Sequence, residues 1–551
     1  MFARLFFYYF CGFEKQILRV GRKIGTQINF NIINMRNRIA KFIMAALLLP
    51  ATAMAGGLVT NTNQSASFIR KPAQDAVLDV TGTYYNPAGL AFLSEGFHLS
   101  LSNQTISQTR TIGSTFPGLA TTEFEGGVSA PLFPTVYAAY KTGPLAVSFG
   151  FNPIGGGGSA NFEDGLPSFE QQVAVLPPSL TAAGIATSQY SMDAAFDGSS
   201  LNWGIQLNVS YALNDMIGVS VGARYIIANN SYKGHLRDIR INPMHPLNAE
   251  GPGNMISAPQ FFTTLAAAAT GAANSMQPII DGGGAFLTLD ELVAFGIITQ
   301  DQANQLAGGL GAGYSSDMTA SQVQQAYQSN AATMNGFAAS TSDMQLDASQ
   351  SGSGIAPVFG INFKISDDLN VAVKYEHKAA ITLTNSTTID DVGMYPDGDE
   401  VASDMPAMLA LGASYRLIPE LKLSGGIHYY FDKNADYGRA LPNDEIIDNN
   451  FWEAAIGVEY YIGNGLSIST GYLRTQTGVN ELYHSDLSHS LSTNSIGAGL
   501  RYQVNPNMAI NMGYMHTLYE THTKSFTVPV SFNETYDRVA STFAIGLDFR
   551  F

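Results

Sequence analysis

The sequence is poor in cysteine and in charged side chains. Its only cysteine, Cys11, lies ahead of the mature start assigned below, so the mature chain has none. This excludes a disulfide framework, a cysteine nucleophile and a cysteine-ligated metal site. Charged residues make up 13% of the chain, about half of the roughly 25% that is usual in soluble domains. Such a composition suits a protein whose surface faces lipid over a large area.

Basic residues are scarce beyond the first 55 positions. Those positions hold eight of the 28 Lys and Arg residues but one of the 44 Asp and Glu residues. The remainder is therefore more acidic than the net charge of −16 for the whole chain suggests. Nucleic-acid binding requires a basic surface, so we expect no nucleic-acid partner.

Long apolar runs are absent, with one exception. A membrane-spanning helix needs about 20 consecutive apolar residues, and only residues 35–55 come near that. There a basic stretch precedes a short apolar core, and Ala53-Met54-Ala55 forms a small-residue cleavage site. We therefore predict a signal peptide at 35–55 and a mature start at Gly56. We interpret residues 1–34 as an over-extended start, with an unusually long leader as the alternative, and exclude them from the fold.

Signatures of catalysis and metal binding are also missing. The sequence contains no H-E-x-x-H motif, and its glycine runs lack the lysine of a phosphate loop. His484 and His489 have the wrong spacing for one helical face. The acidic residues at 390–400 could attract calcium but lack EF-hand spacing, and a solvated acidic loop is the simpler interpretation. We predict no cofactor, no metal site and no enzymatic activity.

What the sequence does contain is alternation of apolar and polar residues with a period of two. Such alternation is typical of strands with one apolar face, and the last segment shows it best, from Val539 to Phe551. We count fourteen segments: 97–111, 134–142, 144–153, 200–212, 215–229, 354–365, 368–384, 406–417, 419–432, 451–463, 465–477, 492–504, 506–520 and 538–551.

The connections between these segments alternate between short and long. The short ones use Gly, Pro, Asn and Asp, as in Gly463-Asn464-Gly465. Short periplasmic turns and long external loops on an even number of strands describe an outer-membrane barrel. Because open sheet edges cannot be satisfied in lipid, we predict an all-β fold, a closed 14-stranded antiparallel transmembrane barrel over 97–551.

The longest connection, 230–353, is predicted to be a partly helical external loop. It is too long to be structureless in a compact protein. Three sequences in it match the helix capping box, in which a Thr and a later Glu or Gln satisfy free N–H groups. They begin at Thr288, Thr299 and Thr319.

The two faces of the predicted strands differ in chemistry. The outward face is rich in Leu, Ile, Val, Phe and Tyr. Aromatic residues near the segment ends would form the interfacial girdles: Tyr225, Tyr429, Phe431, Tyr460, Tyr502 and Tyr519. The inward face carries charges that can pair or remain hydrated in a lumen: Arg224, Lys374, Glu376, Arg416, Lys422, Glu453, Glu459, Arg501, Asp548 and Arg550.

Residues 56–96 precede the first strand and do not alternate. They contain the sequence GTYYNPAGLAFL, in which Asn86, Pro87 and Ala88 follow two tyrosines. Pro and Gly fix a turn there. We therefore expect an ordered plug inside the barrel rather than a periplasmic tail.

The order of these features resembles the FadL/TodX family of outer-membrane transporters for hydrophobic compounds. The resemblance rests on the signal peptide, the Asn-Pro-Ala segment between YY and GL, the fourteen strands and the C-terminal Phe551, and it covers 56–551. It implies an N-terminal hatch in the lumen, external capture loops and a lateral gap at a kinked third strand. Gly150, Asn152 and Pro153 are the candidates for that kink; the alternative is that Pro153 simply ends the strand.

The resemblance also implies a function. We expect a monomer in the Gram-negative outer membrane that takes up small hydrophobic molecules, such as long-chain fatty acids. Its partners would be the hydrophobic ligand, outer-membrane lipid and, through Phe551, the assembly machinery. The loop at 230–353 is longer than is usual in the family, so the ligand class cannot be transferred. Two alternatives stay open: a general porin and, with less support, a barrel-embedded hydrolase.

Overall fold

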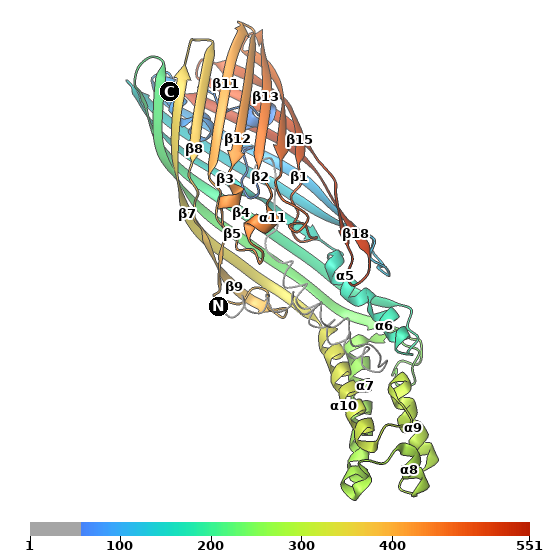
Figure 1. The fold of residues 1–551 in the computed structure, drawn as a ribbon. Helices are drawn as coiled ribbons and strands as arrows, with labels where there is room; N and C mark the ends of the chain where they lie inside the picture. Colours follow the sequence, from blue (N-terminus) through green and yellow to red (C-terminus); the bar gives the residue numbers. More distant parts are fainter. Residues whose placement is uncertain (1–56) are drawn as a thin grey trace. The chain divides into compact units, whose positions relative to one another are not determined.

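The computed structural model describes residues 57–551. The predicted signal peptide at 35–55, the mature start at Gly56 and residues 1–34 lie outside the described residues. In the described part, long antiparallel strands dominate and form one continuous sheet, drawn as arrows in Figure 1.

Fourteen strands among residues 57–551 form a closed wall, because each pairs with two neighbours and β1 pairs with β18. The predicted 14-stranded barrel is thus confirmed. The wall strands are β1 (Gly96–Ser114), β2 (Glu123–Thr142), β3 (Leu145–Phe162), β4 (Tyr190–Ala212), β5 (Ile217–Ile241), β7 (Met344–Lys364), β8 (Leu369–Glu376), β11 (Met408–Ile418), β12 (Leu421–Tyr430), β13 (Trp452–Gly463), β14 (Leu466–Gln476), β15 (Thr493–Asn505), β16 (Met508–Tyr519) and β18 (Phe532–Arg550).

Short strands and helices occupy the connections at the end with the long loops. The strands are β6 (Ile256–Ser257), β9 (Thr382–Asp390), β10 (Glu400–Ala402) and β17 (His522–Phe526). The helices are α5 (Pro167–Ala174), α6 (Leu176–Ala182), η5 (Asp432–Asn434) and α11 (Asn443–Ile446).

Several strands are longer than the alternation predicts. β5 continues to Ile241 instead of ending at 229, and β7 begins at Met344 instead of 354. In these extensions the outward positions are polar, as at Lys233 of β5 and Gln345 of β7. The contrast between the two faces disappears where a strand leaves the lipid. The alternation of apolar and polar residues therefore cannot detect the part of a strand that lies beyond the lipid.

The predicted strand 368–384 is wrong, because it is two strands. β8 ends at Glu376 and β9 begins at Thr382. Both strands pair with β7. Between the two pairings, β7 has four residues (354–357), whereas the chain from β8 to β9 has five (377–381). Within that interruption Ala379 pairs with Met405 in an isolated bridge, and both side chains are buried. The interruption therefore turns apolar side chains toward the interior.

The outward face of the wall is apolar in its middle part. On β18, Phe543, Ile545 and Leu547 point outward between the buried Ala544 and Gly546. Many large apolar side chains of other wall strands are similarly exposed, among them Leu207, Val221, Ile355 and Ile456. A band of exposed apolar side chains on a closed barrel is suited to lipid. The chain is therefore a membrane-spanning barrel of the outer-membrane type.

No helix within residues 57–551 combines the length and the apolar character that crossing a bilayer requires.

The predicted aromatic girdle is confirmed in part. Tyr225, Tyr429, Tyr460 and Tyr502 are each at least 40% exposed on the outer face. The prediction for Tyr519 is wrong, since this side chain is 7% exposed and lies beside the inward-facing Arg538. Tyr519 ends β16 on the inward parity, opposite Thr493.

Residues 263–336 form a compact helical unit within the connection between β5 and β7. The unit contains most of α7 (Ala258–Ile279) and of α10 (Ala320–Ser340). Between them it contains η3 (Ile280–Gly284), α8 (Leu289–Ala294), α9 (Gln300–Leu310) and η4 (Gly311–Gly313). All three predicted capping boxes form, with Thr288 and Glu291 as the first pair. A small apolar core that includes Met276, Leu292 and Val323 holds the unit together.

Candidate functional site: the lumen and the N-terminal segment

The N-terminal segment, residues 57–95, folds into three short helical turns: α3 (Ala66–Arg70), α4 (Gly82–Tyr85) and η2 (Pro87–Phe92). Ser65 caps α3 by accepting a hydrogen bond from the N–H of Phe68. Asn86 caps η2 in the same way through Gly89, and Pro87 occupies the first position, where no N–H is needed. Nearly all of these side chains are buried.

The segment is buried because it lies against the inner face of the wall. α3 contacts β14, β15, β16, β18 and β1, whereas η2 contacts β2, β3, β4, β5, β7 and β8. The two ends of the segment thus contact opposite groups of strands.

Asn86, Pro87 and Ala88 lie at the contact with β4, β5 and β7. The side-chain amide of Asn86 donates to the carbonyl of Val77 (2.9 Å) and to Oδ1 of Asn362 (2.7 Å). The hydroxyl of Ser210 donates to the carbonyl of Pro87 (2.7 Å). Ala88 is fully buried, and a Cβ on Gly218 would come within 2.6 Å of its carbonyl oxygen. The motif therefore fixes the segment to the wall.

Aromatic residues fill the space between the two ends. Tyr85 stacks on Phe68 (5.7 Å between ring centroids) and meets Tyr84 edge-on (4.9 Å). Two inward cations, Arg224 (4.7 Å) and Lys374 (4.5 Å), lie over the ring of Tyr84. The ammonium of Lys374 also donates to the carbonyl of Tyr84 (2.9 Å). Cation–π contacts of this kind strengthen when water is excluded.

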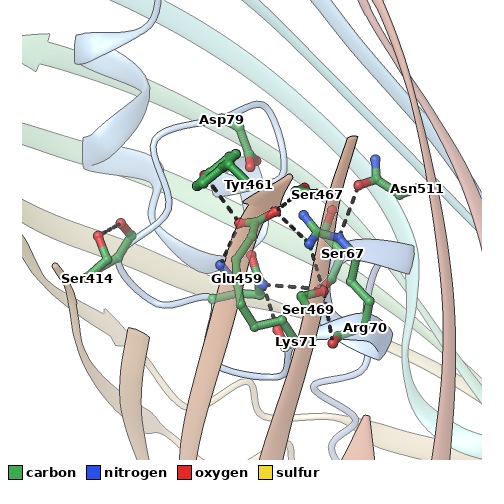
Figure 2. A network of polar contacts seen from close by, with 12 residues as sticks. Ser67, Arg70, Lys71, Asp79, Ser414, Glu459, Tyr461, Ser467, Ser469 and Asn511 are labelled. Carbon is green, nitrogen blue, oxygen red and sulfur yellow. Dashed lines mark hydrogen bonds and ion pairs between the residues drawn. The ribbon is translucent and has the colours of Figure 1, made fainter. Parts of the chain in front are cut away.

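A buried ion-pair cluster attaches α3 to the barrel, as Figure 2 shows. Arg70 donates to Glu459 of β13 (2.8 Å), and Lys71 pairs with the other oxygen of the same carboxylate (3.3 Å). The hydroxyl of Ser467 donates to Glu459 (3.0 Å), and Arg70 also bonds to Asn511 (3.2 Å). Removing one member of such a cluster leaves a buried charge without a partner.

A second cluster centres on His428 of β12. Its Nε2 lies 2.6 Å from Oδ1 of Asp75 in the N-terminal segment, and its Nδ1 lies 3.0 Å from Oε2 of Glu453. Tyr430 and Thr62 donate to the same carboxylate (2.7 and 3.1 Å). The imidazole thus connects an acid of the segment with an acid of the wall.

The sequence identified only the barrel side of these clusters. Glu453, Glu459, Arg224 and Lys374 were predicted to face inward, and they do. Their partners Arg70, Lys71 and Asp75 were missed. The detectable signal was the presence of charged residues, these three among them, in a segment expected to be a plug, since a plug of a charged lumen needs complementary charges.

The ladder between β2 and β3 is interrupted in its middle. It pairs Val136 with Phe151 and resumes at Val128 with Ala160, so residues 129–135 and 152–159 do not pair with each other. β2 contains Pro131 and Pro134 in this stretch, and proline cannot donate to a ladder. The wall thus lacks backbone pairing over several residues at this place.

β3 is irregular over the same stretch. It uses eight residues where β4 uses six, because Ile154 and Gly157 have no partner on β4. Ile154 is buried, and its carbonyl accepts from the N–H of Asn61 in the N-terminal segment (2.8 Å). A Cβ on Gly155 would lie 2.3 Å from the carbonyl oxygen of Val59. β3 therefore contacts the N-terminal segment closely where it departs from regular pairing.

The three predicted kink residues lie at the N-terminal end of this irregular stretch. Gly150 pairs regularly with Tyr137, Asn152 is the first residue that is unpaired with β2, and Pro153 is the last before the shift on β4. Asn152 also donates to Gln64 of the N-terminal segment (2.7 Å). The alternative that Pro153 ends the strand is wrong, because β3 continues to Phe162.

The histidines and acids considered as metal ligands have other contacts. His489 stacks on Tyr536 (5.0 Å) and His484 on His522 (4.0 Å). Burial and His522 lower the pKa of His484 to about 3. In the acidic loop, Asp390 accepts the N–H groups of Met394 and Tyr395. In the described part of the chain, no three such side chains are grouped as metal ligands.

Comparison with solved structures finds proteins of similar architecture. A FadL homologue of Pseudomonas aeruginosa matches with a TM-score of 0.54 at 12% identity, over 90% of this chain and 100% of that one. The Pseudomonas putida toluene transporter TodX matches with a TM-score of 0.47 at 13% identity (86% and 94% covered). The Ralstonia pickettii toluene transporter TbuX matches with a TM-score of 0.47 at 15% identity (89% and 98% covered).

No protein-family model and no curated protein sequence matches this chain. Its class is that of a membrane-spanning outer-membrane barrel with a segment of its own chain packed on the inner wall. The likeness to the Pseudomonas aeruginosa homologue shows that this fold is the FadL-type barrel predicted from the sequence. The descriptions of these three structures name two toluene transporters and a FadL homologue.

Proposed function

We propose that this chain takes up small hydrophobic molecules across the outer membrane. The observation that carries the proposal is the N-terminal segment, which is buried against the inner wall and contacts the wall beside its interrupted ladder. An open water-filled pore gives no advantage to a molecule that dissolves poorly in water. A closed lumen lined with apolar side chains does, because it replaces water with apolar contacts.

Apolar side chains line the lumen toward the external loops. A cluster there includes Phe124, Phe162, Phe196 and Tyr232. Its members come from strands on both sides of the interrupted ladder, among them Val128 of β2 and Ala160 of β3. This cluster, which we call the upper apolar cluster, is where we expect a captured ligand to bind first.

The proposed route has three steps. The ligand is captured at the external loops, transfers to the upper apolar cluster, and leaves sideways between β2 and β3, where the backbones do not pair. Movement of the N-terminal segment would accompany exit, because β3 and this segment are hydrogen-bonded at Asn61 and Ile154. Long-chain fatty acids are one ligand class that fits such a route.

The experiment is an uptake assay in liposomes that contain the purified protein. Under the proposal, toluene or decanoate equilibrates faster than in protein-free liposomes, with saturation, whereas sucrose causes no swelling. Rapid swelling in sucrose would instead support a general porin. Hydrolysis of an ester substrate by the purified protein would support the barrel-embedded hydrolase.

A further inference from the structure

The helix α5, in the connection between β3 and β4, covers part of the upper apolar cluster (Figure 1). It contacts both β1 and β4, the wall strands on either side of β2 and β3. Leu166, just before the helix, belongs to the cluster, and Phe169 packs against it, edge-on to Phe196 (6.1 Å between ring centroids). The helix therefore lies over the place where we expect a captured ligand to bind first.

Two buried acids from other parts of the chain hold one face of α5. Asp486, in the connection between β14 and β15, accepts the N–H of Ser168 (2.8 Å). Glu534, near the start of β18, accepts from the side-chain amide of Gln171 (2.9 Å). Ser168 and Gln171 are three positions apart and thus share a face of the helix. The two carboxylates are brought together under that face, with exposed fractions of 5% and 4%.

This end of β18 lies beyond the lipid, since its outward side chains Asn533, Thr535 and Asp537 are polar. Burial raises the pKa of both carboxyls, and the charge of Asp486 raises the pKa of Glu534 further, to about 7. Two like charges in a place with little water are unfavourable. The pair therefore retains a proton that two hydrated carboxyls would lose.

The groups that face Glu534 compensate its charge only in part. Tyr536 donates to its second oxygen (2.7 Å). Lys524 of β17 lies opposite it in the antiparallel register, but the ammonium donates to the carbonyl of His484 (2.5 Å). The effect of Lys524 on the pKa of Glu534 is smaller than that of burial or of Asp486. On β1 the opposite residue is the uncharged Ser114.

The other titratable and charged groups near the pair are already engaged with one another. His522 lies 3.2 Å from Glu481 and stacks on His484. His489 stacks on the ring of Tyr536 (5.0 Å). Farther along β18, Arg538 is opposite Arg110 of β1 and lies over the ring of Tyr519 (5.1 Å).

The segment that carries α5 is bounded by two glycines in the left-handed region. Gly165 has a φ of 72° and Gly184 a φ of 90°, a conformation that glycine adopts without strain. Residues 166–183 lie between them. On its other side, α5 stays attached through Glu170, which accepts from the hydroxyl of Tyr190 (2.6 Å). Loss of the two acid contacts would thus release the N-terminal end of α5 while this attachment remains.

We propose that residues 166–183 form a lid that is closed over the upper apolar cluster while Glu534 or Asp486 holds a proton, and that opens at its α5 end when both are ionised. This inference rests on the proposed uptake function and adds its regulation by pH. A carboxyl whose pKa is raised in the closed arrangement favours closing below its ordinary pKa of 4.5. That preference is lost as the pH rises to about 7.

The test is thiol labelling, which needs no ligand and is made possible by the absence of cysteine after residue 11. Ala194→Cys places a thiol under the lid, because Ala194 is 6% exposed and a Cβ on Gly165 would lie 2.9 Å from its Cβ. Ser191→Cys, exposed on the same strand, corrects for the ionisation of the thiol itself. The ratio of their maleimide labelling rates should rise about tenfold or more between about pH 5 and about pH 8, since one pKa unit changes the ratio of two states about tenfold.

Three variants in this background test the acid pair. Glu534→Gln should keep the ratio low at both pH values, because the amide is uncharged and still accepts hydrogen bonds. Asp486→Asn should move the rise to lower pH, because the charge that raises the pKa of Glu534 is removed, and it tests the pair even if Glu534→Gln does not fold. Asp537→Asn, at an exposed acid of the same strand, is the matched control and should leave the rise unchanged.

Uptake of toluene, which has no ionisable group, separates the lid from the proposed function. It should be faster at about pH 8 than at about pH 5. A labelling ratio that does not change with pH, or that rises equally in Glu534→Gln, overturns the lid and leaves saturable toluene uptake standing. Equal uptake at the two pH values despite a rising ratio overturns the regulation. Absence of toluene uptake at both values overturns the uptake function and, with it, its regulation.

Discussion

At the scale of single residues, the side of the wall to which a side chain points decides its contribution. Leu547 and Asp548 are neighbours on β18, but the first points outward and the second inward, where Asn511 donates to its carboxylate (2.7 Å). Charge on the lipid face costs roughly 2–4 kcal/mol at mid-depth for Arg or Lys. The change Asp548→Asn should have a smaller cost, because the amide that replaces the carboxylate can still accept the hydrogen bond from Asn511.

We predict that Leu547→Arg reduces folding into lipid vesicles much more than Asp548→Asn. The measurement is the fraction of protein that shows the heat-modifiable gel mobility of a folded barrel. Similar yields for the two variants, or a lower yield for Asp548→Asn, would mean that the register is shifted by one residue.

A second residue-scale prediction concerns Glu459. Glu459→Gln leaves Arg70 and Lys71 buried without their shared anion, which costs about 3–5 kcal/mol when a buried pair is broken. The N-terminal segment should then open more often, and trypsin should cleave after Arg70 at least tenfold faster. Glu95→Gln is the control, because its side chain is 65% exposed in its pair with Lys141. Unchanged cleavage in Glu459→Gln would show that the pair does not hold the segment.

At the scale of elements, the irregular β3 is the feature on which lateral exit depends. Deleting Ile154 and Gly157 removes the two residues that lack partners on β4. Regular pairing with β4 should return, and β3 should become free to pair with β2. We predict that this variant folds, shows the same ion conductance as the wild type, and takes up decanoate or toluene more slowly.

Unchanged uptake in the double deletion would contradict lateral exit at β3. If the double deletion folds and uptake is unchanged, ligands do not leave between β2 and β3. Leu213-Asn214 in the short turn after β4 supplies the control deletion, because shortening this turn leaves the β2–β3 interruption untouched. That control should keep wild-type uptake once folding is confirmed by gel mobility.

The elements also show what the sequence could and could not predict. Lipid-facing strand segments such as 538–551 were predictable because burial in lipid enforces the alternation. The extensions of β5 and β7 were not, since both faces are polar beyond the membrane. The split between β8 and β9 was missed because residues 377–381 contain no Gly, Pro, Asn or Asp that would mark a break. Only the tertiary contact of Ala379 with Met405 distinguishes them.

The same limit applies to the lumen. Asn86, Pro87 and Ala88 could be singled out by their turn-forming chemistry, and Glu459 could be placed inward by parity. That Glu459 pairs with Arg70, 389 positions earlier, could not be predicted from either pattern. Nor could the opposition of Arg110 and Arg538, because it depends on which strands close the barrel and in which register.

At the scale of the whole molecule, the account depends on one claim: the N-terminal segment closes the barrel. Polar, aromatic and ionic contacts connect this segment to strands on opposite sides of the wall. A barrel of fourteen strands whose lumen is closed in this way should pass few ions. Its transport would then depend on binding rather than on diffusion through water.

The most direct test is the single-channel conductance of the protein in a planar lipid bilayer, compared with a variant that lacks residues 57–84. We predict that the wild type conducts little. The variant should conduct like an open porin, because it lacks α3 and with it the ion pairs of Arg70 and Lys71 with Glu459. A wild-type protein that already conducts like a porin would contradict the account, as would a folded deletion variant whose conductance stays low.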